Sequence, residues 1–146
     1  MLLSQNHFLF PILLFGAFGA GLPVTLASSN SSPNGLLNQW NDTRPKCIIT
    51  SSSLVPVALK MLGLAGILPG NAAKRIIVFV DGVSTEPLPS LPFISYKRIV
   101  GNGKLHEEEK FPNEEASEVA LICYSSGTGG SPKGVQVWVI QSSAGS

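Results

Sequence analysis

Short apolar runs alternate with longer amphipathic or apolar stretches through the first half of the chain. The short runs have the length and bulk of buried strands, and they occupy residues 22–26, 47–50 and 75–80. The longer stretches carry helix-starting residues, and they predict helices over residues 7–20, 32–42 and 54–64. Strands that alternate with helices are typical of an α/β layer built on a parallel sheet.

Capping and breaking residues mark the expected ends of these elements. We expect Asn6 to cap the first helix and the serine run at 51–53 to cap the third. Pro33 suits the first turn of the second helix, where its missing N–H matters little. Pro69-Gly70 is expected to break the chain before the strand at 75–80, and Asp81-Gly82 to form the turn after it.

The second half of the chain has a different pattern. Pro87, Pro89 and Pro92 mark a connector, and a further strand is expected near residues 95–100. The sequence HEEEK at 106–110 is typical of a solvated charged turn. Residues 118–124 form an apolar run, and residues 134–140 alternate with the two-residue period of a strand.

Together these patterns predict an incomplete α/β domain. Its first part is a partial doubly wound sheet of parallel type with flanking helices, and a strand–loop–strand hairpin follows. The chain divides into an α/β subdomain (1–82), a proline-rich connector with a charged turn (83–117), the hairpin (118–140) and an unstructured tail (141–146).

Composition removes several classes of function. The 146 residues are 44% hydrophobic and 13% charged, with a net charge of +1, so neither long disorder nor a global field for nucleic acid is expected. The two cysteines cannot form a framework of several disulfides, and the cysteines and histidines do not have the spacing of a zinc site. We therefore expect no nucleic-acid partner and assign no metal ligand.

The first 41 residues contain no Asp, Glu, Lys or Arg, which raises a question of targeting for the apolar stretch 8–26. A secretory signal needs a positive n-region, and residues 1–7 supply no charged side chain. The stretch is nearly long enough to span a membrane, but prolines and glycines interrupt it. We favour a buried helix followed by a buried strand; a membrane span or a signal segment is the alternative, with Asn30 and Asn41 as sequons in that case.

Residues 124–134 concentrate the groups that bind phosphate. The segment YSSGTGGSPKG supplies hydroxyl donors, glycine amides and the ammonium group of Lys133. Its spacing fits neither a Walker loop nor a dinucleotide fingerprint, because Pro132 stands where each requires a glycine. Both fingerprints also open a helix, whereas the pattern after this loop predicts a strand. A flexible hairpin turn is the other interpretation of the same composition.

The segment YSSGTGGSPKGV at 124–135 resembles the ATP-phosphate loop of the acyl-adenylate-forming, or AMP-binding, ligases, which include acyl-CoA synthetases, coumarate–CoA ligase-like enzymes and luciferases. Gly129 stands where that family usually has a second threonine. Weaker similarity covers residues 3–21 and 36–50 and Pro112-Asn113. The residues that match the family pattern are Ser125, Ser126, Gly127, Thr128, Gly130, Pro132, Lys133 and Gly134.

The resemblance implies a ligase that uses ATP and Mg²⁺ to convert a carboxylic acid to an acyl-AMP and then passes the acyl group to a thiol such as coenzyme A. The loop would bind the ATP phosphates in an electrostatic role. The residues expected to do so are Ser125, Ser126, Gly127, Thr128, Gly129, Gly130 and Lys133.

The family's other motifs lie further along its sequence, so we expect this chain to be a fragment that keeps the phosphate loop but is inactive alone. No catalytic residue is assigned in it. An intracellular location, cytoplasmic or peroxisomal, is expected. The alternatives are a small membrane-anchored or secreted non-enzymatic protein, and a shortened relative that docks with a full-length ligase through exposed strand edges.

Overall fold

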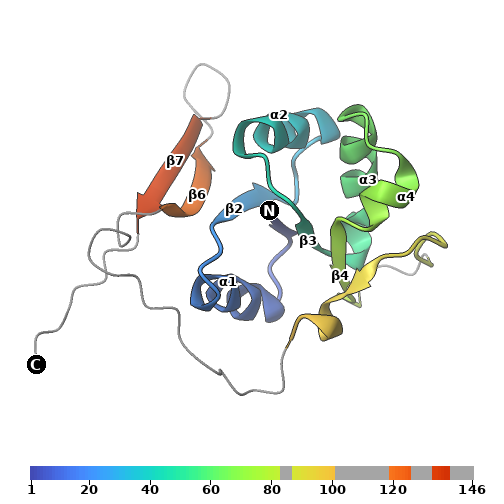
Figure 1. Ribbon diagram of the computed structural model, residues 1–146, viewed down its shortest axis with the longest axis horizontal. Helices are drawn as coiled ribbons and strands as arrows, with labels where there is room; N and C mark the ends of the chain where they lie inside the picture. Colours follow the sequence, from blue (N-terminus) through green and yellow to red (C-terminus); the bar gives the residue numbers. More distant parts are fainter. Residues whose placement is uncertain (83–86, 101–118, 126–132, 139–146) are drawn as a thin grey trace, which may run out of the picture.

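The computed structural model describes residues 1–82, 87–100, 119–125 and 133–138, and these residues build one seven-stranded sheet (Figure 1). The strand order is β5-β4-β3-β1-β2-β6-β7. All neighbouring strands are parallel except β6 and β7, which are antiparallel. The strands are β1 (Leu2–Ser4), β2 (Val24–Ser28), β3 (Ile48–Ser51), β4 (Ile76–Phe79), β5 (Ile94–Ser95), β6 (Val119–Ser125) and β7 (Lys133–Trp138). The predicted α/β fold with a mostly parallel sheet is confirmed.

Helices cover both faces of the sheet. Figure 1 shows α1 on one side and α2, α3 and α4 on the other. This arrangement follows from the connections, because the crossover from β1 to β2 runs through α1, whereas those leaving β2 and β3 run through α2 and α3. The helices are α1 (Leu9–Gly19), α2 (Pro33–Thr43), α3 (Val55–Leu64) and α4 (Pro69–Ala73), with single 3₁₀ turns η1 (Ser52–Leu54) and η2 (Tyr96–Arg98).

Successive strand residues contribute to two separate cores. Leu2 packs with the α1 side, whereas Leu3 packs with α2 and α3. The same alternation places Val78 in the α2/α3 core and Phe79 in the α1 core. Because strand side chains point alternately to opposite faces, apolar residues at consecutive positions are required wherever both faces are covered. This explains why the strands read as continuous apolar runs.

The first helix begins later than its expected cap. The helix spans Leu9–Gly19, and the Leu9 amide donates to Nδ1 of His7 at 3.2 Å, so the expected cap at Asn6 is wrong. A helix that began at His7 would place Pro11 at a position whose missing N–H removes an internal hydrogen bond. Starting at Leu9 keeps Pro11 in the first turn.

The serine run at 51–53 does not cap the third helix. The hydroxyl of Ser52 donates to Oδ1 of Asp81 at 2.8 Å, and the hydroxyl of Ser53 donates to Oδ2 of the same carboxylate. Asp81 therefore ties the end of β4 to the turn that leads from β3 into α3. The expected break at Pro69-Gly70 also differs, because Pro69 begins α4, where proline is tolerated at the first helical position. Residues 94–98 form a two-residue strand and a 3₁₀ turn instead of a strand at 95–100.

The apolar stretch 8–26 divides into α1 and the start of β2. Within the described ranges, no helix has the length and apolar character needed to cross a bilayer. Only one side of α1 is buried, with Leu9 and Leu13 each 7% exposed, whereas Phe8 is 72% and Phe15 67% exposed. The expected helix and strand are both present, but the helix is not buried all round, and the strand runs over Val24–Ser28, two residues later than expected.

Candidate functional site

Strands β6 and β7 form the stem of the predicted phosphate loop. They pair in antiparallel register, with Ser125 directly opposite Lys133 and Tyr124 opposite Gly134. Residues 126–132, and with them the predicted site residues Ser126, Gly127, Thr128, Gly129 and Gly130, lie outside the described part of the chain. The stem thus brings Ser125 and Lys133 to the two sides of the loop's base, and the Lys133 side chain is exposed to solvent.

Tyr124 and Gly134 lie opposite each other in the stem and pack closely together. A Cβ atom added to Gly134 would lie 3.3 Å from Cζ and 3.4 Å from Oη of Tyr124, and 3.4 Å from Cγ2 of Ile122. The 3.3 Å distance is tighter than most Cβ contacts, so a side chain at this position requires the tyrosine ring to shift by a few tenths of an ångström. A glycine directly opposite the tyrosine therefore leaves room for the ring in the stem.

A buried hydrogen-bond network attaches the stem to α2. Nε2 of Gln39 donates to Oγ1 of Thr25 at 2.6 Å and to the carbonyl oxygen of Leu26 at 2.8 Å. The Thr25 hydroxyl donates in turn to the carbonyl oxygen of Ile122 on β6, at 3.4 Å. Gln39 is 6% and Thr25 4% exposed, so the bond between them is buried, and the bonds to the two carbonyl oxygens are partly buried. The network fixes β6 against β2 and both strands against α2.

A second contact joins α2 to the stem one residue before Ser125. The hydroxyl of Tyr124 donates a hydrogen bond to Oδ2 of Asp42. Partial burial of the phenol, together with this bond and the negative charge of Asp42, raises the pKa of Tyr124 to about 12. Tyr124 therefore remains neutral at physiological pH and acts as a hydrogen-bond donor.

Sequence reasoning identified the loop but missed the residues that hold it. Thr25, Gln39 and Asp42 were not singled out, because single polar residues on a strand or helix carry no distinctive motif. The only local signal is that Gln39 and Asp42 are three residues apart and therefore lie on one face of α2. That spacing permits both side chains to reach the same neighbouring element.

The groups at the stem suit a phosphate better than a metal ion. Lys133 supplies an exposed positive charge, and the partner at the opposite side of the loop base is the main chain of Ser125. An ammonium group on a flexible side chain can reach phosphate oxygens from such a position. In the ranges that the structure describes, no three His, Cys, Asp or Glu side chains gather as a metal site, and no Mg²⁺ ligand is assigned there.

Comparison with known proteins finds acyl-CoA synthetases and CoA ligases among the similar sequences. The sequence pattern of the family described as "AMP-binding enzyme" matches residues 1–139. A segment of 92 residues, 59% of this chain, is 36% identical to Long chain acyl-CoA synthetase 6, peroxisomal, from Arabidopsis thaliana and covers 13% of that protein. A longer match of 138 residues, 92% of this chain, is 28% identical to Peroxisomal OPC-8:0-CoA ligase 1 from the same plant and covers 22% of it.

Solved structures share the fold at lower identity. The red-emitting luciferase of Phrixothrix hirtus superposes with a TM-score of 0.70 at 22% identity, over 94% of this chain and 25% of the luciferase. The acyl-CoA synthetase of Brucella canis superposes with a TM-score of 0.63 at 17% identity, over 94% of this chain and 23% of that enzyme.

This chain spans less than a quarter of the length of either plant relative. Because the family pattern extends from β1 through the stem, the chain belongs to the AMP-binding enzyme family.

Proposed function

We propose that this chain supplies the first α/β layer and the ATP-phosphate loop of an adenylate-forming ligase of the acyl-CoA synthetase type. In that reaction a carboxylate attacks the α-phosphate of ATP, which gives an acyl-AMP and releases pyrophosphate. The thiol of coenzyme A then takes the acyl group and AMP leaves. The chain would act as a fragment of this machinery, with no activity when isolated.

The observation that carries this proposal is the geometry of the stem. Antiparallel pairing sets Ser125 and Lys133 opposite each other, so both ends of the intervening loop start from fixed positions. A fixed stem matters because electrostatic stabilisation of a departing phosphate needs donors that are already in place. Hydrogen bonds join α2 to β2, and further hydrogen bonds join β6 to both of these elements. These bonds supply that rigidity.

We assign ATP-phosphate contacts to Ser125, Ser126, Gly127, Thr128, Gly129, Gly130 and Lys133. The amides and hydroxyls in the loop would donate to phosphate oxygens, and Lys133 would add one positive charge. Mg²⁺ supplies charge neutralisation when it binds with the nucleotide, and its protein ligands would come from other parts of a complete enzyme. A cytoplasmic or peroxisomal location is part of the proposal, and it is supported by two relatives whose names include "peroxisomal".

Exchange of pyrophosphate with ATP tests the proposal in two forms. The purified chain should show no exchange with any carboxylic acid, because catalysis needs several groups held together. A chimera in which residues 1–138 replace the matching segment of Peroxisomal OPC-8:0-CoA ligase 1 should show exchange. Lys133→Ala in the chimera should lower the rate at least about 100-fold.

The matched control is Lys60→Ala, which removes an ammonium group that is also exposed, on α3. This variant should leave the chimera's rate unchanged. A folded chimera whose exchange rate is insensitive to Lys133→Ala would contradict the assignment of the phosphate loop. Exchange by the purified chain alone, lost on the same substitution, would contradict its description as an inactive fragment.

A further inference from the structure

A hollow of about 350 Å³ lies between the end of α2 and the start of β4, and none of the loop-stem residues lines it. Its walls come from Trp40, Asn41, Arg44, Pro45 and Arg75. This volume is within the range of small-molecule sites, which runs from about 300 to 1,000 Å³. Two arginines from distant parts of the sequence therefore face one concave surface.

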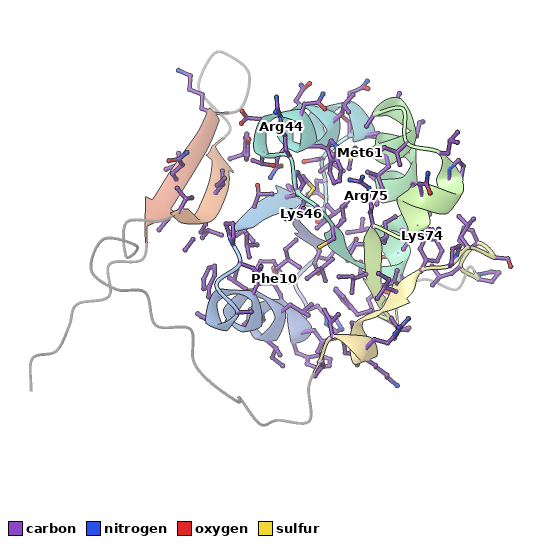
Figure 2. The ribbon with its side chains drawn as sticks, viewed as in Figure 1. Phe10, Arg44, Lys46, Met61, Lys74 and Arg75 are labelled. Atoms are coloured by element: carbon purple, nitrogen blue, oxygen red, sulfur yellow. The ribbon has the colours of Figure 1, made fainter. Side chains whose placement is uncertain are left out.

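Each arginine of this hollow has a lysine close to it in the sequence. Arg44 and Lys46 lie in the segment that enters β3, and Lys74 and Arg75 lie in the segment that enters β4 (Figure 2). All four side chains are exposed. The described lining of the hollow has no acidic residue, and Asp42, two positions before Arg44, accepts the Tyr124 hydroxyl. The balance of charge at the hollow is therefore positive although the whole chain carries only +1.

The two guanidinium groups are available to a ligand. Among the described residues, the side chains of Arg44 and Arg75 make no hydrogen bond and no ion pair. Arg44 is held in place through its main chain, since its amide donates to the carbonyl oxygen of Trp40 at 2.8 Å. Trp40 is buried and Pro45 has a fixed ring, so the wall that carries Arg44 is rigid.

Arg44 also occupies an unusual backbone position. Its φ of 46° is left-handed, and it is the only non-glycine residue with positive φ among those that the structure describes. Glycine is the common choice at such a helix end, because a side chain there adds strain. The favourable interaction of a cation with the helix C-terminus accounts for a positive residue near this end, but not for the choice of the strained position itself.

We propose that this hollow binds a phosphate group of a small molecule, held between Arg44 and Arg75. A guanidinium presents a planar fork of N–H donors that matches two phosphate oxygens, and two such forks facing one hollow can hold a single phosphate from both sides. Lys46 and Lys74 add long-range attraction. The site is separate from the phosphate loop and does not rest on the proposed ligase function.

Two classes of ligand carry such a phosphate group, namely inorganic polyphosphates and nucleotides. The probes are therefore inorganic pyrophosphate and adenosine 3′,5′-bisphosphate, each titrated at low salt. Trp40 lies in the wall of the hollow, and Trp138→Phe leaves it as the sole tryptophan of the chain. Trp40 fluorescence in this variant should change saturably with at least one probe, and the probe that binds identifies the source.

Two substitutions locate the binding. Arg44→Gly removes one guanidinium and relaxes the left-handed backbone, so a loss of affinity with an unchanged or higher melting temperature is not an effect of unfolding. Arg75→Gln removes the other. Each should weaken binding by about ten-fold or more. Lys133→Gln should leave Trp40-detected binding unchanged, which separates this site from the phosphate loop.

The matched control is the double variant Lys97→Gln, Arg98→Gln, which removes two exposed positive charges from η2 and leaves the hollow intact. It should bind both probes as the parent does. The proposal is overturned if neither probe gives a saturable change, if Arg44→Gly and Arg75→Gln bind as tightly as the parent, or if the control loses as much affinity as they do.

Discussion

The hydroxyl of Tyr124 donates a hydrogen bond to the carboxylate of Asp42, and the two residues are 82 positions apart in the sequence. Tyr124 stands on β6 one residue before the base of the proposed phosphate loop, and Asp42 stands in the last turn of α2. The bond therefore links the loop stem directly to a helix that covers one face of the sheet (Figure 1). Together with the buried Gln39 network, it makes α2 the support of the stem.

This bond predicts a late titration of Tyr124. The chain has two tyrosines, and the pKa of Tyr124 is raised to about 12 from an ordinary value of 10.0. In absorbance at 295 nm, we expect one of the two phenols to ionise well above pH 10. Tyr124→Phe should remove the late step, and Asp42→Asn should lower its pKa. A late step that survives Tyr124→Phe would contradict this prediction.

The same shift predicts a loss of stability at high pH. A group whose folded pKa exceeds its unfolded pKa contributes stability below the unfolded value, and this contribution disappears as the pH rises through the folded value. The window for Tyr124 therefore runs from about pH 10 to about pH 12. Urea unfolding across this range should show a steeper decline for the parent than for Tyr124→Phe. Equal slopes would contradict the prediction.

Gln39 should contribute more to stability than its exposed neighbour. Gln39→Leu removes two hydrogen bonds and leaves the Leu26 carbonyl and the Thr25 hydroxyl without their donor in a buried site. The expected loss in the free energy of unfolding is about 1–3 kcal/mol. Asn38→Leu on the same helix is the control, since Asn38 is exposed, and it should change stability by less than about 0.5 kcal/mol.

Two glycines should respond to alanine with opposite signs. Gly134→Ala places a Cβ 3.3 Å from the Tyr124 ring, so it should destabilise the chain by about 1 kcal/mol or more. Gly63→Ala adds a Cβ with no atom within 4 Å on an exposed face of α3, so it should stabilise by about 0.5–1 kcal/mol. Both changes are measured by urea unfolding, and Tyr124→Ala should reduce the effect at Gly134. An undiminished effect in that background would show that the ring is not its cause.

Adjacent residues on α1 should differ sharply. Leu13 is 7% exposed and packs into the core beside Leu2 and Phe79, whereas Ile12 is 53% exposed. Leu13→Ala should lower the free energy of unfolding by about 2–5 kcal/mol, because it leaves a cavity. Ile12→Ala should change it by less than about 0.5 kcal/mol. A large loss at Ile12 in a monomeric sample would mean that its face of α1 is covered in solution.

The sequence by itself determined the elements and the motif. Apolar runs located β2, β3 and β4 in the parallel part and both strands of the hairpin, because covering both faces of a sheet requires consecutive apolar residues. The local resemblance of residues 124–135 indicated the family, since the spacing of glycines, hydroxyls and a lysine is a local property of the chain. Errors arose where one distant residue changed a local choice, as Asp81 did at the serine run.

Tertiary structure alone decided how the site is held and where charge gathers. The placement of β6 beside β2 brings Thr25 to the Ile122 carbonyl, 97 residues away, and no periodicity in the chain encodes that pairing. Arg44 and Arg75 likewise share a hollow only because β3 and β4 are neighbours in the sheet. Single polar side chains acquire these roles through folding, because a hydrogen bond or an electric field depends on distance in space and not along the chain.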